Sequence, residues 1–178
     1  MPDHEFILPS DLKANYLAYR DELRAAALRV LDSGWYIGGK EVDAFEDAFA
    51  AFAETGHAIG VASGTDAIIL ALRACGIGPG DIVLTVSHTA VATVAAVELV
   101  GATAALVDVD PRTFGMDPAA LRAACANLAD GRNGHLRAVL PVHIYGHPVD
   151  LAAIQATAQE YGLVLIEDCA QAHGARLG

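Results

Sequence analysis

Two spacings of apolar residues follow each other along the chain, one typical of helices and the other of buried strands. From Ser10 to Leu31, and again over residues 41–54, apolar side chains recur at every third or fourth position. We therefore expect a helix in each segment. In the second helix the stripe should pack into a core, and it consists of Val42, Phe45, Phe49 and Phe52.

Beyond residue 56, short apolar runs alternate with longer helical segments, and Gly, Pro and Asp residues separate them. The runs predict strands at 57–62, 82–86, 103–107, 137–142 and 163–166. The intervening segments predict helices at 67–74, from after Thr89 through 100, at 118–128 and at 150–161. Such alternation predicts an α/β fold with three α/β/α layers around a mostly parallel sheet.

Polar clusters follow three of the predicted strands directly. They comprise Ser63, Gly64 and Thr65 after the first strand, Ser87 to Thr89 after the second, and Asp168 to His173 after the last. Right-handed crossovers bring the carboxyl ends of parallel strands to one edge, where α/β proteins bind their ligands. We therefore expect the three clusters to share one site.

Each cluster suits one part of a phosphorylated aromatic cofactor. The N–H groups that open the helix after Ser63 favour an anion, and Gly64 allows close approach of the backbone. His88 offers a flat ring, and Asp168 suits a protonated heterocyclic nitrogen because an opposite charge favours the charged form. The alternatives are that Ser63 only caps its helix and that Asp168 caps the following turn.

Three other kinds of site are weaker. His143, His147, His173 and Asp168 are possible metal ligands, but their spacing matches no metal motif, so no metal is expected. A serine nucleophile is disfavoured because G-x-S-x-G is absent. A plain nucleotide-binding domain should carry G-x-G-x-x-G, which residues 61–66 lack.

The composition of the chain restricts the kinds of partner it can bind and the cellular compartment in which it is expected. The 178 residues are 54% hydrophobic and 19% charged, which excludes disorder, and the net charge of −11 makes nucleic acid an unsuitable partner. Three scattered cysteines suggest a reducing compartment, and the first 13 residues carry no signal-peptide pattern. Glu98 and Gly101 interrupt the most apolar window, which favours a buried helix and strand over a membrane span. We expect a cytoplasmic protein.

Several ordered motifs resemble one enzyme family, the DegT/DnrJ/EryC1/StrS sugar aminotransferases, which are pyridoxal-phosphate enzymes of fold type I. The matching segments are GWYIGG at 34–39, SGTDA at 63–67, GIGPGD at 76–81, SHT at 87–89, GA at 101–102, VDVD at 107–110, HIYG at 143–146 and IEDCAQAHGA at 166–175. The helical spacing predicts an N-terminal helical segment over residues 1–33, and the resemblance, which covers about residue 34 to the end, implies part of the large cofactor-binding domain over 34–178.

The same resemblance implies roles for particular residues. Ser63, Gly64 and Thr65 would bind the phosphate of pyridoxal or pyridoxamine phosphate (PLP or PMP), and His88 would stack on its ring. Asp168 would pair with the pyridinium nitrogen, and Gln171 would hydrogen-bond the 3-oxygen. The implied substrates are a nucleotide-linked keto sugar and glutamate, and the implied assembly is a homodimer.

One departure concerns the family's catalytic lysine, which forms the Schiff base and lies beyond the final motif. The chain has only Lys13 and Lys40, and neither matches that position. We therefore predict no catalytic residue in this chain, and we expect it to be the first part of an enzyme without its C-terminal domain. Two alternatives stay open: a PMP-dependent sugar dehydratase of the same family, and a non-catalytic remnant or partner domain.

Overall fold

A computed structural model describes residues 10–132 and 134–177. The first nine residues, where no signal peptide is predicted, lie outside this part. The chain divides into two compact units, an N-terminal unit Met1–Ile59 and a C-terminal unit Gly60–Gly178. No helix in the described ranges combines the length and the hydropathy needed to cross a bilayer.

The N-terminal unit is helical. The helix predicted from Ser10 to Leu31 is in fact two, α1 (Leu12–Ala18) and α2 (Arg20–Ser33), which meet at Tyr19. Asp11 begins α1 by accepting a hydrogen bond from the Ala14 N–H at 3.0 Å. A left-handed glycine, Gly34, ends α2.

The third helix, α3 (Lys40–Ala53), corrects one prediction. Its aromatic stripe was expected in a core, yet the Phe45 and Phe52 side chains are 59% and 55% exposed. The rings of the stripe contact one another instead, with Phe49 lying 5.6 Å from Phe45 and 6.1 Å from Phe52 between centroids. Helical spacing alone identifies an apolar face, but it does not supply the surface that would cover it.

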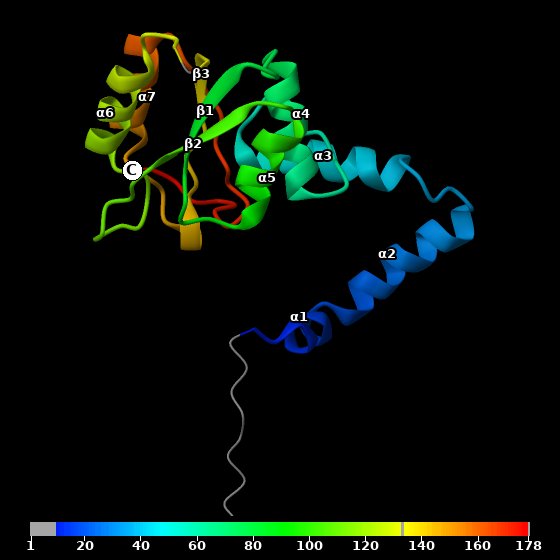
Figure 1. The fold of residues 1–178 in the computed structure, drawn as a ribbon. Coiled ribbons are helices and arrows are strands. Elements are labelled where there is room, and N and C mark those ends of the chain that lie inside the picture. The colour runs from blue at the N-terminus through cyan, green and yellow to red at the C-terminus, as the bar shows by residue number, and fades with distance from the viewer. Residues whose placement is uncertain (1–9, 133, 178) are drawn as a thin grey trace, which may run out of the picture. The chain divides into compact units, whose positions relative to one another are not determined.

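The C-terminal unit contains a four-stranded parallel sheet in the order β2-β1-β3-β4 among the described residues. Its strands are β1 (Asp81–Val86), β2 (Thr103–Val107), β3 (His135–Val139) and β4 (Val164–Leu165). Its main helices are α4 (Gly64–Ala74), α5 (Val91–Leu99), α6 (Pro118–Leu128) and α7 (Leu151–Tyr161). Helices α4 and α5 lie on one side of the sheet and α6 and α7 on the other (Figure 1). The predicted α/β/α fold is confirmed.

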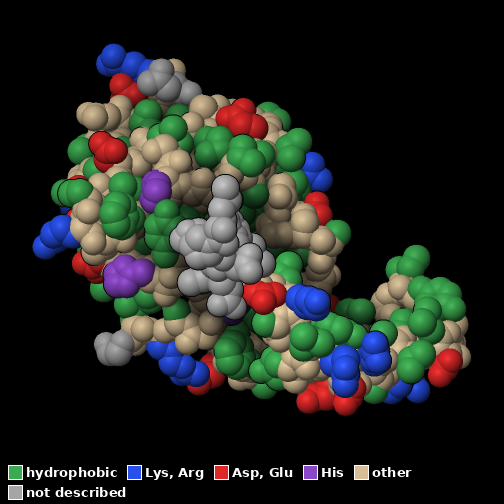
Figure 2. Space-filling view, turned by 90° about the horizontal axis from the view of Figure 1, so that it is seen from below, with side chains coloured by type: hydrophobic (Ala, Val, Ile, Leu, Met, Phe, Trp, Pro, Cys, Tyr) green, Lys and Arg blue, Asp and Glu red, His purple; other side chains and the backbone are tan. Residues whose placement is uncertain are grey.

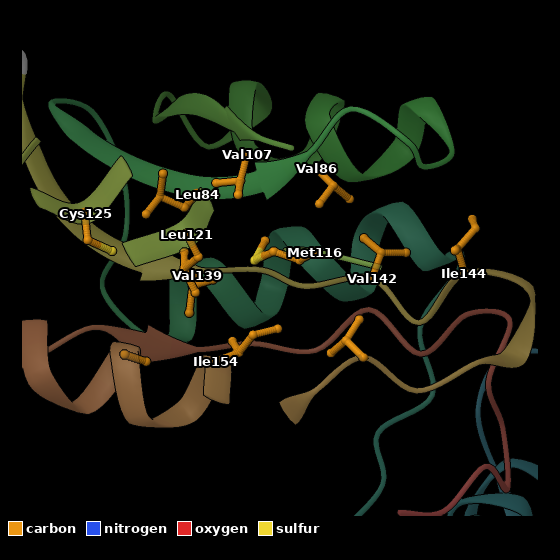
Figure 3. Packing of buried hydrophobic residues seen from close by; sticks show 12 residues of the cluster. Leu84, Val86, Val107, Met116, Leu121, Cys125, Val139, Val142, Ile144 and Ile154 are labelled. Atoms are coloured by element: carbon orange, nitrogen blue, oxygen red, sulfur yellow. The ribbon is translucent and has the colours of Figure 1, made fainter. Parts of the chain in front are cut away.

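Alternate residues of the central strands build the two halves of the core. Leu84 and Val139 point toward α6 and α7, while Val83, Ala138 and Leu140 point toward α4 and α5. Both faces of the sheet are therefore apolar, as expected for a parallel sheet covered by helices. Figure 3 shows that the half of the core that faces α6 and α7 continues past the end of β3 to Val142 and Ile144.

Three predicted strands differ from the structure. The predicted strand 137–142 corresponds to β3, which begins at His135 and ends at Val139. Residues 57–62 form no strand, because no described strand lies beside them to share a ladder of hydrogen bonds. The predicted strand 163–166 shortens to the two residues of β4. Pro141, on the neighbouring segment, has no N–H to donate, and the ladder resumes only at the isolated bridge between Val142 and Asp168.

Hydrophobic side chains also occupy much of the outer surface. On the face drawn in Figure 2 they are interspersed with acidic and basic side chains. Such scattering is ordinary for a protein surface and identifies no site by itself.

Candidate functional site

Asp168 lies at the carboxyl edge of the sheet and is nearly buried, with 9% of its surface exposed. Its backbone is fixed on both sides, because its N–H donates to the Pro141 carbonyl at 2.9 Å and its carbonyl accepts from the His143 N–H at 3.1 Å. The side chain accepts from the Ala170 N–H at 3.1 Å and from the Thr93 hydroxyl at 2.8 Å. The carboxylate is thus held at the strand end in one orientation.

The hydroxyl chain that reaches Asp168 has a defined direction. The Thr93 Oγ1 lies 2.8 Å from both Asp168 Oδ2 and Thr89 Oγ1. An ionised carboxylate can only accept, so Thr93 donates its single proton to Asp168, and Thr89 must then donate to Thr93. Since Thr89 follows His88 in the chain, this relay links the second predicted cluster to the third.

The charge of Asp168 has no protein partner in residues 10–132 and 134–177. No Lys, Arg or His nitrogen there forms an ion pair with it. A buried carboxylate with two hydrogen-bond donors but no cation retains lone pairs for a further donor. A protonated ring nitrogen would supply both the missing donor and the missing positive charge.

His88 is half-buried in the turn between β1 and α5. Its ring lies beside two aromatic rings, with centroid separations of 5.8 Å to Phe114 and 5.7 Å to Tyr145. Its Nε2 atom lies 3.2 Å from the Tyr145 hydroxyl oxygen, a hydrogen bond whose donor depends on the tautomer. The ring is therefore oriented by neighbours rather than left to rotate.

Gln171 joins the same group through the backbone of Tyr145, whose N–H donates to Gln171 Oε1 at 2.8 Å. Contacts consequently run from Asp168 through Thr93 and Thr89 to the turn of His88, and from there through Tyr145 to Gln171. Three of the predicted site residues, His88, Asp168 and Gln171, thus lie in one connected group.

The other predicted site residues, Ser63, Gly64 and Thr65, begin α4. The Ser63 hydroxyl accepts from the Asp66 N–H at 3.1 Å and donates to the Asp66 carboxylate at 2.8 Å, so it caps the helix. The N–H groups of Gly64 and Thr65 precede the first carbonyl available within the helix. They are the donors that this turn offers to an anion.

The packing of α4 against α5 shows which way this turn points. A Cβ built on Gly78, just after α4, would lie 3.6 Å from the Val100 carbonyl, and one on Gly101, just after α5, 2.9 Å from Pro79 Cγ. The C-terminal ends of both helices therefore meet at the amino edge, where residues 79–81 enter β1. The N-terminal ends, including the turn at Gly64, point toward the carboxyl edge that holds Asp168.

A separate polar cluster on the other side of the same strand end consists of His143, Glu167 and Cys169. His143 Nδ1 accepts from the Val149 N–H at 3.2 Å, and Nε2 lies 2.9 Å from a Glu167 oxygen. In the neutral ring, Nε2 must then carry the proton and donate it to Glu167. A ring whose two nitrogens are used in this way suits a metal ion poorly, because ligating histidines turn their second nitrogen to an acceptor.

The structure does not bring together the four residues that the sequence offered as possible metal ligands. Among the described residues, no three of His143, His147, His173 and Asp168 come together as potential ligands. His143 instead pairs with Glu167, and Asp168 faces Thr93 on the opposite side.

Sequence reasoning assigned no role to Thr93 or Tyr145, and it included Thr89 only as part of the polar cluster that follows the second predicted strand. Thr93 lies on α5, whereas Thr89 lies just before this helix, so helical spacing gave no signal that the two hydroxyls would meet. Tyr145 gave only a weak signal, namely a large residue beside the turn glycine Gly146.

Comparison with known proteins places this geometry in a family. The model of the DegT/DnrJ/EryC1/StrS aminotransferase family matches residues 18–178. The chain belongs to this family. The resemblance read from the motifs is therefore confirmed.

Individual relatives of this DegT-family chain are sugar aminotransferases. A dTDP-3-amino-3,4,6-trideoxy-alpha-D-glucose transaminase from Streptomyces venezuelae is 49% identical over 166 residues, which cover 93% of this chain and 42% of that protein. A UDP-N-acetyl-3-dehydro-alpha-D-glucosamine 3-aminotransferase from Acidithiobacillus ferrooxidans is 44% identical over 167 residues, or 94% of this chain and 43% of that protein. The crystal structure of S. venezuelae DesV with a ketimine intermediate has a TM-score of 0.86 and 47% identity, covering 94% of this chain and 45% of that one.

The chain thus spans less than half the length of the relatives that it matches. Aminotransferases of the DegT family depend on pyridoxal phosphate. The residues present fit that cofactor, because a buried carboxylate that has no cationic partner in the described part of the chain, an oriented ring and helix N–H groups face the same edge of the sheet.

Proposed function

We propose that this chain provides the cofactor-binding part of a pyridoxal-phosphate-dependent aminotransferase that acts on a nucleotide-linked keto sugar, with glutamate as amino donor. The observation that carries the proposal is the Asp168 carboxylate, which is buried, hydrogen-bonded and without a cationic partner among the described residues. Residues 34–178 would carry the site, residues 1–33 would form a helical segment, and the assembled enzyme would be a homodimer.

The named substrates of the relatives support the substrate class. One relative is named for a dTDP-linked amino sugar and another for a UDP-linked keto sugar. A nucleotide-linked sugar is their common feature, whereas the nucleotide and the sugar differ between them. The proposal therefore extends to the class and leaves the individual sugar open.

When bound, pyridoxal phosphate supplies an electron sink and carries the amino group between the two substrates. In the proposed site, Asp168 would keep a proton on the ring nitrogen, and the hydrogen bonds from Thr93 and Ala170 would hold the carboxylate in one orientation toward that atom. The N–H groups of Gly64 and Thr65, with the adjoining hydroxyls, hold the phosphate at the positive end of the α4 dipole.

The two remaining residues act on the plane of the ring. His88 covers one face and excludes water from it, and Gln171 donates an N–H to the 3-oxygen. Neither Lys13 nor Lys40 receives a catalytic role, because neither matches the position of the family's catalytic lysine.

A binding experiment tests the cofactor site directly. PMP is a suitable probe because it binds without forming a bond to a lysine. We expect isothermal titration to detect PMP binding to the 178-residue chain. Asp168→Asn should weaken this binding by about 10- to 100-fold, the value of a hydrogen bond to a charged group. Glu160→Gln, which removes one negative charge from the exposed side of α7, should leave the affinity unchanged.

A second variant tests the role of Gln171. Gln171→Glu keeps an acceptor for the Tyr145 N–H but replaces the amide donor with a second acceptor. It should weaken PMP binding, whereas an unchanged affinity would contradict a donated hydrogen bond to the 3-oxygen. No measurable PMP binding by the unmodified, folded chain would refute the proposed site.

The substrate class needs a chimaera in which residues 1–178 replace the matching part of the S. venezuelae transaminase. We expect the chimaera to transfer the amino group of glutamate to the dTDP-linked keto sugar used by that enzyme. A chimaera that binds PMP but transfers no amine would contradict the proposed reaction.

A further inference from the structure

Tyr145 connects two residues of the proposed site, although no motif or family resemblance assigned it a role. We propose that Tyr145 is a positioning residue, which fixes both the ring of His88 and the side-chain amide of Gln171 for the cofactor. This inference rests on the proposed function and deepens it. It is carried by the backbone conformation of Tyr145 and by its two hydrogen bonds.

The backbone of Tyr145 is strained. Its φ of 57° and ψ of 17° place it in the left-handed helical region, which is unfavourable for a residue with a Cβ. Among the described residues, only Glu54, Phe114 and Tyr145 combine a side chain with a positive φ, and two of these three contact the His88 ring. Strain of this kind persists where surrounding contacts impose it, and it is concentrated at functional sites.

Burial does not explain why a tyrosine occupies this strained position. The Tyr145 side chain is 70% exposed, so it contributes little to the core. Its polar contacts with His88 and Gln171 are therefore what the conformation provides. Gly146 completes the arrangement, because a Cβ there would approach the Gln171 carbonyl oxygen to 3.1 Å.

The first contact determines which way the Gln171 amide faces. A backbone N–H can only donate, and the Tyr145 N–H points at Gln171 at 2.8 Å. The oxygen of the amide must therefore face Tyr145, which turns the NH₂ group away from it. An NH₂ group is the end required to donate a hydrogen bond to the 3-oxygen of a pyridoxal ring.

The second contact restrains the His88 ring. The Tyr145 hydroxyl oxygen lies 3.2 Å from Nε2, and the Tyr145 and His88 rings meet edge to face at 63°. Phe114 lies against the same imidazole with an interplanar angle of 41°. A ring with these neighbours is ordered before a cofactor arrives, which reduces the entropy lost on stacking.

The experiment compares Tyr145→Phe with a matched control, Tyr161→Phe. The first variant removes only the hydroxyl that contacts His88 and retains the backbone N–H that contacts Gln171. The control makes the same chemical change on α7, where Tyr161 packs against the core cluster. Circular dichroism checks that both variants fold, and two readouts are then measured on the full chain.

The first readout uses the cofactor-free protein. At fixed pH, the imidazole ¹⁵N and ¹H signals of His88 should shift in Tyr145→Phe and stay in place in Tyr161→Phe. The second readout is PMP titration. Loss of one hydrogen bond should raise the Kd for PMP about 2- to 10-fold in Tyr145→Phe, with no change in the control.

The outcomes separate this inference from the proposed function. Unshifted His88 signals in Tyr145→Phe, or a PMP affinity equal to that of the unmodified chain, would overturn the positioning role while leaving the cofactor site intact. An unmodified chain that binds no PMP refutes the proposed function, and the role of Tyr145 toward the cofactor falls with it. Shifted His88 signals together with weaker PMP binding support the inference.

Discussion

Thr93→Val tests whether the hydroxyl relay stabilises the buried charge of Asp168. Thr93 is fully buried on α5, and valine has nearly the same shape as threonine. The substitution therefore creates little cavity, but it removes the O–H that donates to Asp168 Oδ2 at 2.8 Å. It also deprives the Thr89 hydroxyl of its acceptor.

The magnitude follows from the charge of the acceptor. A hydrogen bond to an ionised group contributes about 1.5–3 kcal/mol, whereas one between neutral groups contributes about 0.5–1.5 kcal/mol. Thr85 provides the neutral comparison, because it is equally buried and donates to the Leu140 carbonyl at 2.8 Å. We expect Thr93→Val to lower the free energy of unfolding of the C-terminal unit by about 2 kcal/mol, and Thr85→Val by about 1 kcal/mol.

The assay must report the C-terminal unit. Trp35, the only tryptophan, lies in the N-terminal unit, and its fluorescence would follow the wrong part of the chain. Amide hydrogen exchange of β1 and β3, measured by mass spectrometry, follows the sheet itself. A loss of 2 kcal/mol should reduce protection there by about 30-fold.

Asp168→Asn completes a double-mutant cycle with Thr93→Val. If the charge of Asp168 causes the larger effect, Thr93→Val should cost about 1 kcal/mol less in the Asn background. Equal losses for Thr93→Val and Thr85→Val, together with no coupling to Asp168, would refute the directional relay.

Two further predictions concern the cluster behind Asp168. Partial burial raises the pKa of the Cys169 thiol, and the negative charges of Glu167 and Asp168 raise it further. Alkylation of Cys169 at pH 7.5 should therefore be slower than alkylation of a free thiol. Its rate should increase about tenfold per pH unit. Glu167→Gln should speed this reaction at fixed pH, and a rate equal to that of a free thiol in the unmodified chain would contradict the shift. His143 should carry its proton on Nε2, because Nδ1 accepts from the Val149 N–H; ¹⁵N NMR showing the Nδ1–H tautomer would contradict the assigned bond.

The alternation of apolar runs determined most of the C-terminal unit from the sequence. The predicted strand 103–107 and the predicted helix 118–128 coincide with β2 and α6. Such segments are legible because each buries its apolar positions against neighbours that are close in the chain. The expectation that His88, Asp168 and Gln171 lie at one edge follows from the same parallel topology.

Contacts between segments far apart in the chain determine whether a strand forms and whether an apolar face is buried, and the spacing of apolar residues does not show these contacts. Residues 57–62 have the composition of a strand, but a strand forms only beside a partner, and the described chain supplies none. The stripe of α3 is apolar, yet the helical spacing did not show that Phe45 would be 59% exposed.

The chemistry of the site shows the same division. The sequence shows directly that an acid, a ring and an amide, namely Asp168, His88 and Gln171, follow predicted strands. That Thr93 donates to Asp168, and that Tyr145 turns the amide of Gln171, depends on atoms 75 and 26 residues apart in the chain. A hydrogen bond is set by distance and direction in space, so only the tertiary structure could determine it.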